Sequence, residues 1–201
     1  MKTLLAGMAI TLAASTAALA FDAETQAIID KHKAGKLVVI ADVAHLMLAS
    51  AKWCYDDQDH SCAWTEVYLE VTDSAATFEL GNSWDAETDY ALTDEGAFND
   101  NKICQTGMNW VPNLRGTRRS DGTSIGGRQL HALKQAVAES RPDLESYDDC
   151  FDYLYVSSDP AQQLVTLRQR QYVDGVHDPL NDVEVTVHFN AEDAAGLTLR
   201  L

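Results

Sequence analysis

The chain has 201 residues and a formal net charge of −16, because 31 Asp and Glu residues outnumber 15 Lys and Arg residues. A charge of this sign repels phosphate backbones and anionic lipid surfaces, which argues against binding to nucleic acid or to a membrane surface. The length suits one domain with a sizeable buried core.

The first twenty residues have the features of a cleavable secretory signal. Lys2 precedes an apolar run over residues 4–14, and Ala18-Leu19-Ala20 matches the small-residue pattern at a cleavage site. The run is too short for a permanent membrane helix, which takes about 20 apolar residues. We therefore expect an exported protein, periplasmic or extracellular, that begins near Phe21, has a net charge of −17 and is not inserted in a membrane.

The mature chain contains four cysteines, and an even number in an exported protein predicts two disulfides. Three connectivities are possible. We favour Cys54 with Cys62, which closes a short polar loop, and Cys104 with Cys150, which joins two strand-like segments. No C-x-x-C pair is present, which disfavours a zinc or redox centre, and no cofactor is expected.

Helical patterns open the mature chain. Asp22 can cap a helix that Gly35 would end. Asp42 can cap a second helix, because the apolar positions 43, 46, 47 and 51 recur at helical spacing. Residues 37–40 fit either a strand or the start of this second helix.

From Trp64 onward the apolar period changes to two, which predicts a half-buried strand. Its core-facing side chains are expected to be Val67, Leu69 and Val71, and its solvent-facing side chains Glu66, Tyr68 and Glu70. Residues 76–80 alternate again and should complete a hairpin. The acidic stretch that follows is expected to be irregular, with a turn at Asp94-Glu95-Gly96.

The second half of the chain contains one helix and several strands. Residues 107–128 suggest a hairpin or a long loop, and a helix should run from about residue 130 to Pro142. Residues 164–173 and 183–189 should pair as an antiparallel hairpin, with His188 on its outward face. The fold class is α+β over residues 21–201: an antiparallel sheet with N-terminal helices and one interposed helix.

Two polar clusters are candidate sites. Asp56, Asp57 and Asp59 lie inside the first predicted disulfide loop and offer the oxygen ligands that calcium takes, although the EF-hand glycine and closing glutamate are missing. The alternative is a solvated acidic loop. Arg115, Arg118 and Arg119 could hold a carboxylate or phosphate, or could simply neutralise nearby acids.

No segment has a specific catalytic motif: G-x-S-x-G, H-E-x-x-H and the Walker loop are absent, and S-x-x-K does not occur after residue 20. We therefore expect a non-catalytic accessory module of the cell envelope that binds a small ligand or an envelope protein. One alternative is a hydrolase with a dispersed Asp/His/Ser site, since such a site is defined by geometry. Another is a calcium-stabilised structural protein.

Overall fold

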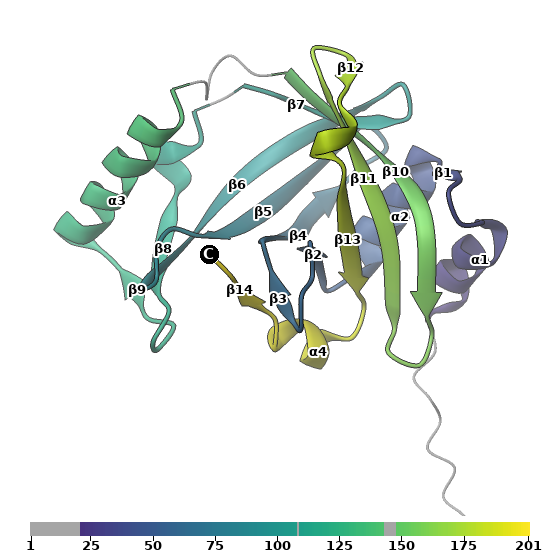
Figure 1. The fold of residues 1–201 in the computed structure, drawn as a ribbon, viewed down its shortest axis with the longest axis horizontal. Coiled ribbons are helices and arrows are strands. Elements are labelled where there is room, and N and C mark those ends of the chain that lie inside the picture. The colour runs from purple at the N-terminus through teal and green to yellow at the C-terminus, as the bar shows by residue number, and fades with distance from the viewer. Residues whose placement is uncertain (1–20, 108, 143–147) are drawn as a thin grey trace, which may run out of the picture.

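A computed structural model describes residues 21–107, 109–142 and 148–201 (Figure 1). Antiparallel sheet is the main structural element, with 46% of the residues in strands and 25% in helices, which agrees with the predicted combination of an antiparallel sheet with a few helices. None of the helices in these residues is long and apolar enough to cross a membrane. The predicted signal, residues 1–20, lies outside the described residues.

Eight strands pair side by side until the sheet closes on itself. Every pairing is antiparallel, and β7 completes the circuit because it pairs with β6 on one side and with β10 on the other. We call this circuit the ring. In spatial order it consists of β10 (Asp148–Asp159), β11 (Leu164–Val173), β13 (Val183–His188), β2 (Lys52–Tyr55), β4 (Trp64–Val71), β5 (Ala75–Ser83), β6 (Thr88–Asn99) and β7 (Lys102–Thr106).

Two helices and a short strand precede the ring in sequence and pack against it. They are α1 (Ala23–Lys31), β1 (Leu37–Val38), which extends the sheet beside β10, and α2 (Ile40–Ala49). Apolar residues of α2, among them Leu46 and Met47, share the main core with Trp53 and Tyr55 of β2. These contacts bury the apolar face of the helix, which is what its sequence spacing requires.

The predicted cap of the second helix is wrong. The helix begins at Ile40, and Asp42 lies within its first turn. The Asp42 carboxylate is buried and pairs with Lys31 (2.6 Å) and His32 (2.8 Å) at the end of α1. Asp42 therefore links the two helices, an interaction between distant residues that capping rules do not consider.

The β5–β6 hairpin continues beyond the ring and supports a second layer, which we call the arm. The arm contains η1 (Val111–Asn113), β8 (Arg115–Arg118), which pairs with the first part of β6, β9 (Ser124–Ile125) and α3 (Gly127–Ser140). Leu133 and Val137 of α3 pack on Leu92, Trp110 and Leu114 in a core separate from that of the ring. The predicted interposed helix and the predicted hairpin are both present.

Short elements complete the chain. They are β3 (Ser61–Cys62), β12 (Val176–His177), η2 (Pro179–Asn181), α4 (Ala191–Ala195) and β14 (Thr198–Leu199), which pairs in parallel with β3. Both predicted disulfides are confirmed: Cys54–Cys62 joins β2 to β3, and Cys104–Cys150 joins β7 to β10. The second disulfide therefore crosses the place where the ring closes.

The two faces of β4 are the reverse of the prediction. Glu66, expected in solvent, is 7% exposed, and Leu69, expected in the core, is 57% exposed. Hydrogen bonds from the hydroxyls of Tyr55 and Tyr68 satisfy the buried carboxylate. A bulge between Tyr68 and Glu70 then shifts the alternation, so that Val71 packs against the main core after all.

The predicted turn at Asp94-Glu95-Gly96 is also wrong, because these residues lie inside β6. The glycine has a packing role: a Cβ at Gly96 would lie only 2.4 Å from the side chain of Ile103 in β7. The missing Cβ lets β7 approach β6 where the ring closes.

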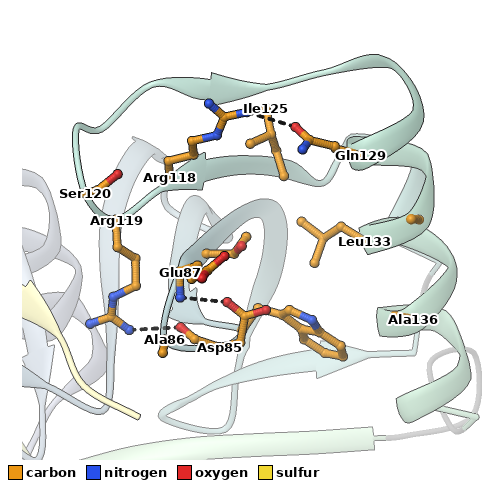
Figure 2. A pocket seen from close by; sticks show the side chains of 13 residues that line it. Asp85, Ala86, Glu87, Arg118, Arg119, Ser120, Ile125, Gln129, Leu133 and Ala136 are labelled. Carbon is orange, nitrogen blue, oxygen red and sulfur yellow. Dashed lines mark hydrogen bonds between the residues drawn. The ribbon is translucent and has the colours of Figure 1, made fainter.

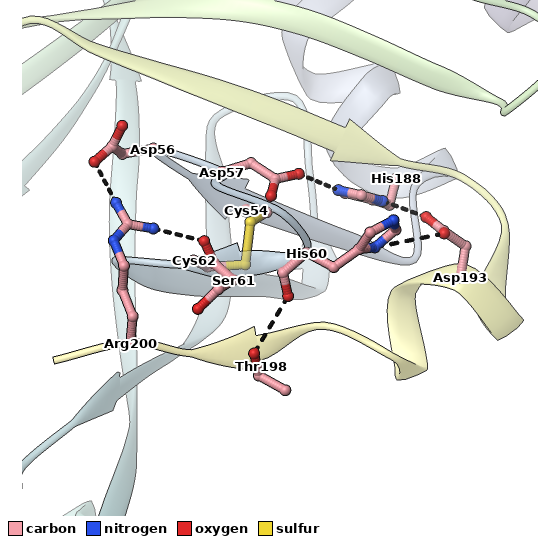
Figure 3. The surroundings of a disulfide bond; sticks show 10 residues. All are labelled: Cys54, Asp56, Asp57, His60, Ser61, Cys62, His188, Asp193, Thr198 and Arg200. Atoms are coloured by element: carbon pink, nitrogen blue, oxygen red, sulfur yellow. Dashed lines mark hydrogen bonds and ion pairs between the residues drawn. A yellow bond between two sulfur atoms is a disulfide. The ribbon is translucent and has the colours of Figure 1, made fainter. Parts of the chain in front are cut away.

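The predicted hairpin between β11 and β13 is present, and His188 lies on its outward face as predicted, because Val183, Val185 and Val187 alternate with it and face inward. However, His188 is buried instead of exposed to solvent. His188 lies opposite Leu164 and is 1% exposed. Residues 174–182, which connect the two strands, contain β12 and η2. The helix α4 and the loop after β2 then cover the face of β13 that carries His188 (Figure 3).

Candidate functional site

The inner face of the ring encloses a cavity of about 190 Å³. This is room for roughly six water molecules at about 30 Å³ each. The residues that matter for its chemistry come from β4, β10 and β11; they are Trp64, Glu66, Tyr68, Phe151, Tyr153 and Gln169. The cavity wall therefore combines aromatic and aliphatic side chains with several amides and a single carboxylate.

Glu66 is held by a network of tyrosine hydroxyls. Its Oε2 accepts hydrogen bonds from Tyr55 (2.7 Å) and Tyr68 (2.8 Å). The Gln169 amide donates to the Tyr153 hydroxyl (3.0 Å) and reaches the Tyr55 hydroxyl at 3.4 Å. The network holds the carboxylate and the phenol groups in one arrangement, because the folded protein is destabilised when a buried polar group has no hydrogen-bond partner.

The Glu66 carboxylate has no cationic partner. All Lys, Arg and His residues from Phe21 onward belong to the described part of the chain, and none lies within ion-pair distance of Glu66. Burial raises the pKa of Glu66 from 4.5 to about 7, although the two tyrosine hydrogen bonds act in the opposite direction. The nearby carboxylate of Asp94 raises this pKa further. The ring interior therefore contains a carboxylate that is about half ionised near neutral pH.

The cavity reaches the surface near η2. Asn181 of η2 is exposed, Val183 and Gln171 are half-buried, and all three line the cavity. The end of the cavity nearest to solvent therefore lies at η2.

A second and larger cavity, of about 760 Å³, lies in the arm between α3, the β8–β9 hairpin and residues 84–88 (Figure 2). Arg118 and Arg119 line it, but both are engaged. Arg119 pairs with Asp89 (3.4 Å) and donates to the backbone carbonyls of Asp85 and Leu199, and Arg118 donates to Gln129 (3.0 Å). Because Asp85 and Glu87 also line the cavity, its charge is mixed.

The three arginines predicted as an anion site do not converge. Arg115 pairs with Glu79 of β5 and does not line the arm cavity. Arg115 and Arg119 are each paired with a carboxylate.

The three predicted calcium ligands also separate (Figure 3). Asp56 pairs with Arg200, and Asp57 lies beside His188. Within residues 21–107, 109–142 and 148–201, one group of His, Cys, Asp and Glu side chains is close enough to share an ion: Cys54, Asp57 and His188. Asp56 and Asp59 are not in it.

One histidine meets both a hydroxyl and a carboxylate, as a hydrolase would require. The Nε2 of His45 lies 3.1 Å from the Thr25 hydroxyl, and its Nδ1 lies 3.5 Å from Glu24. However, Thr25 is fully buried and its hydroxyl donates to Asp22 (2.5 Å). The hydroxyl belongs to the cap of α1 and is not presented to a substrate.

Comparison with protein-family models, curated proteins and solved structures finds no match. The chemistry of the ring must therefore be argued from its geometry. Sequence reasoning missed Glu66, Tyr55 and Gln169 as site residues, because it placed Glu66 in solvent. The available signal was that both aromatic residues of this strand, Trp64 and Tyr68, share a face with Glu66.

Proposed function

We propose that this chain is an exported, non-catalytic binding module and that its ring binds a small organic cation, with Glu66 as the counter-charge. The observation that carries the proposal is a buried carboxylate in the wall of a cavity with no basic residue beside it. Burying a charge without a partner costs several kcal/mol. A cationic ligand would supply the missing partner.

The aromatic lining supports the same ligand class. Trp64, Tyr68, Phe78, Phe151 and Tyr153 line the cavity, and Tyr55 stacks on Trp64 with ring centroids 4.6 Å apart. The faces of aromatic rings attract ammonium groups, and cages of such rings bind methylated ammonium ligands. A carboxylate combined with aromatic faces favours a cation over a neutral or anionic molecule.

Protons and ligand would compete for Glu66. In the empty ring a proton neutralises the carboxylate in about half of the molecules near pH 7. An ammonium ligand needs the ionised form, so its binding would release that proton. The negative charge of the whole chain would also attract cations toward the mouth at η2.

Export remains part of the proposal. The two disulfides are consistent with an oxidising compartment, and the pattern of residues 1–20 supports secretion. N-terminal sequencing of the protein recovered from its own cells should begin at Phe21.

Calorimetric titration with choline and tetramethylammonium tests the ring directly. We expect one binding site at pH 8 for these cations and none for the neutral choline isostere, in which carbon replaces nitrogen. Glu66→Gln should abolish binding, whereas Glu70→Gln, on the exposed face of the same strand, should leave it unchanged. Equal binding of choline and its neutral isostere, or binding that survives Glu66→Gln, would overturn the proposal.

A further inference from the structure

A second polar cluster lies outside the ring, where three segments meet beside the Cys54–Cys62 disulfide (Figure 3). The loop after β2 supplies Asp57, the end of β13 supplies His188, and α4 supplies Asp193. The imidazole of His188 is almost completely buried, and its Nδ1 lies 2.6 Å from the Asp193 carboxylate. This hydrogen bond fixes the orientation of the imidazole of His188.

The other nitrogen of His188 has no hydrogen-bond partner. The closest carboxylate oxygen, Oδ2 of Asp57, lies 3.6 Å from Nε2, which is too long for a hydrogen bond. Oδ1 of Asp57 is also buried without a partner. Nε2 of His188 and the Asp57 carboxylate therefore face each other without a hydrogen bond between them. Buried polar groups normally have a hydrogen-bond partner.

The gap has the size that a shared metal ion requires. Zinc binds imidazole nitrogen and carboxylate oxygen at about 2.0 to 2.2 Å, so two ligands of one tetrahedral ion are about 3.4 Å apart. In neutral His188, an Nδ1–H donated to Asp193 leaves the lone pair on Nε2 facing Asp57. Metal-binding histidines usually have such a carboxylate on the far nitrogen, because it selects the tautomer that binds the ion.

We propose that Nε2 of His188 and the Asp57 carboxylate bind a transition-metal ion, zinc being the expected one, and that Asp193 is a positioning residue for His188. Imidazole suits zinc, copper and nickel better than calcium. The site is separate from the ring and does not depend on the function proposed for Glu66.

His60 lies next to the two proposed ligands. The His60 ring is 59% exposed, and its centroid lies 6.4 Å from that of His188. Water or His60, after rotation of its side chain, would complete the coordination. The sulfur of Cys54 lies in the same group, but its disulfide leaves no thiolate for the ion.

Calorimetric titration of the disulfide-bonded, metal-free protein with zinc chloride tests the site. We expect one zinc per chain and an increase in the melting temperature with zinc concentration. Asp57→Asn should weaken zinc binding at least tenfold. Asp193→Asn should weaken it 10- to 100-fold with the stoichiometry unchanged, as expected of a group that orients a ligand.

Asp182→Asn is the matched control. Asp182 also contacts a histidine, His177 at 2.7 Å, but this pair belongs to no group that could share an ion in the described part of the chain. The zinc affinity of the Asp182→Asn variant should equal that of the wild type. Undiminished binding in Asp57→Asn, or the absence of zinc uptake at millimolar concentration, would overturn the proposal. A preference for calcium over zinc would overturn it as well.

Discussion

The Glu66→Gln substitution should change how the stability of the protein depends on pH. The folded protein binds a proton at Glu66 with a pKa of about 7, against an ordinary value of 4.5. Between these values the folded state holds more protons than the unfolded state at this position. The free energy of unfolding therefore falls as the pH rises from about 4.5 to 7, and it stops falling above the folded pKa.

The size of the effect follows from the shift in pKa. At about 1.4 kcal/mol per pKa unit, the Glu66 contribution amounts to about 3 kcal/mol over the whole range. Most of this, about 2 to 3 kcal/mol, should be lost between pH 5 and pH 8. Glutamine keeps an oxygen that can accept the hydrogen bonds of Tyr55 and Tyr68, but it has no charge to bury. The free energy of unfolding of the Glu66→Gln variant should therefore lack the pH dependence that Glu66 causes in the wild type.

Urea unfolding of the wild type and of Glu66→Gln at pH 5, 6, 7 and 8 measures the difference. The advantage of the glutamine variant should grow by about 2 to 3 kcal/mol across this range, which corresponds to a gain of roughly 4 to 12 °C in melting temperature at pH 8. Glu70→Gln, on the exposed face, should follow the wild type and accounts for the change in net charge. Parallel curves for the wild type and Glu66→Gln would refute the reasoning.

Three further predictions concern the fold. Replacing both Cys104 and Cys150 with alanine should cost about 4 kcal/mol by loop entropy and should weaken choline binding, because this disulfide crosses the closure of the ring; denaturant unfolding and titration measure the two effects. Asp152→Asn should cost about 2 kcal/mol, because Asp152 is buried and accepts two hydrogen bonds from Arg170 (2.6 and 2.7 Å); an unchanged urea midpoint would be inconsistent with this bond. Leu69→Ala should change stability by less than about 0.5 kcal/mol, whereas a loss above 2 kcal/mol would mean that Leu69 faces the core.

Features encoded by neighbouring residues were predictable from the sequence. The helix before Pro142 follows from the spacing of Leu130, Leu133 and Val137, and the disulfide pairs follow from loop length and strand pattern. The hairpins that contain β4 and β13 follow from alternation and turn residues. The helix and the hairpins depend on residues that lie close together in the chain, and four cysteines can pair in only three ways.

Features set by distant residues were not predictable. Alternation divides β4 into two faces, but the choice of the inner face depends on Tyr55 and on the ring that β7 closes. An acidic residue inside the ring contradicts the expectation that the apolar face is buried. His188 does face outward, but its burial was not predictable, because α4 and the loop of Asp57 that cover it come from other parts of the chain.

The candidate site residues show the same division. The cluster of Arg115, Arg118 and Arg119 was visible as a local excess of positive charge, yet Glu79 and Asp89 of other strands pair with two of these arginines. The local signal for Glu66, two aromatic residues on its strand face, was outweighed because a single acid in a strand usually faces solvent. The role of Glu66 could be inferred only from the residues around it, and these come from four strands, β2, β4, β10 and β11.

The affinity of the wild-type protein for tetramethylammonium at pH 6 and pH 8, measured by calorimetric titration, tests the central claim most directly. The probe keeps its charge at both pH values, so only the protein titrates. The ionised fraction of Glu66 rises from about one tenth to about nine tenths across this range, and the affinity should rise about tenfold. The same affinity at both pH values would contradict the assignment of Glu66 as the counter-charge of the ligand.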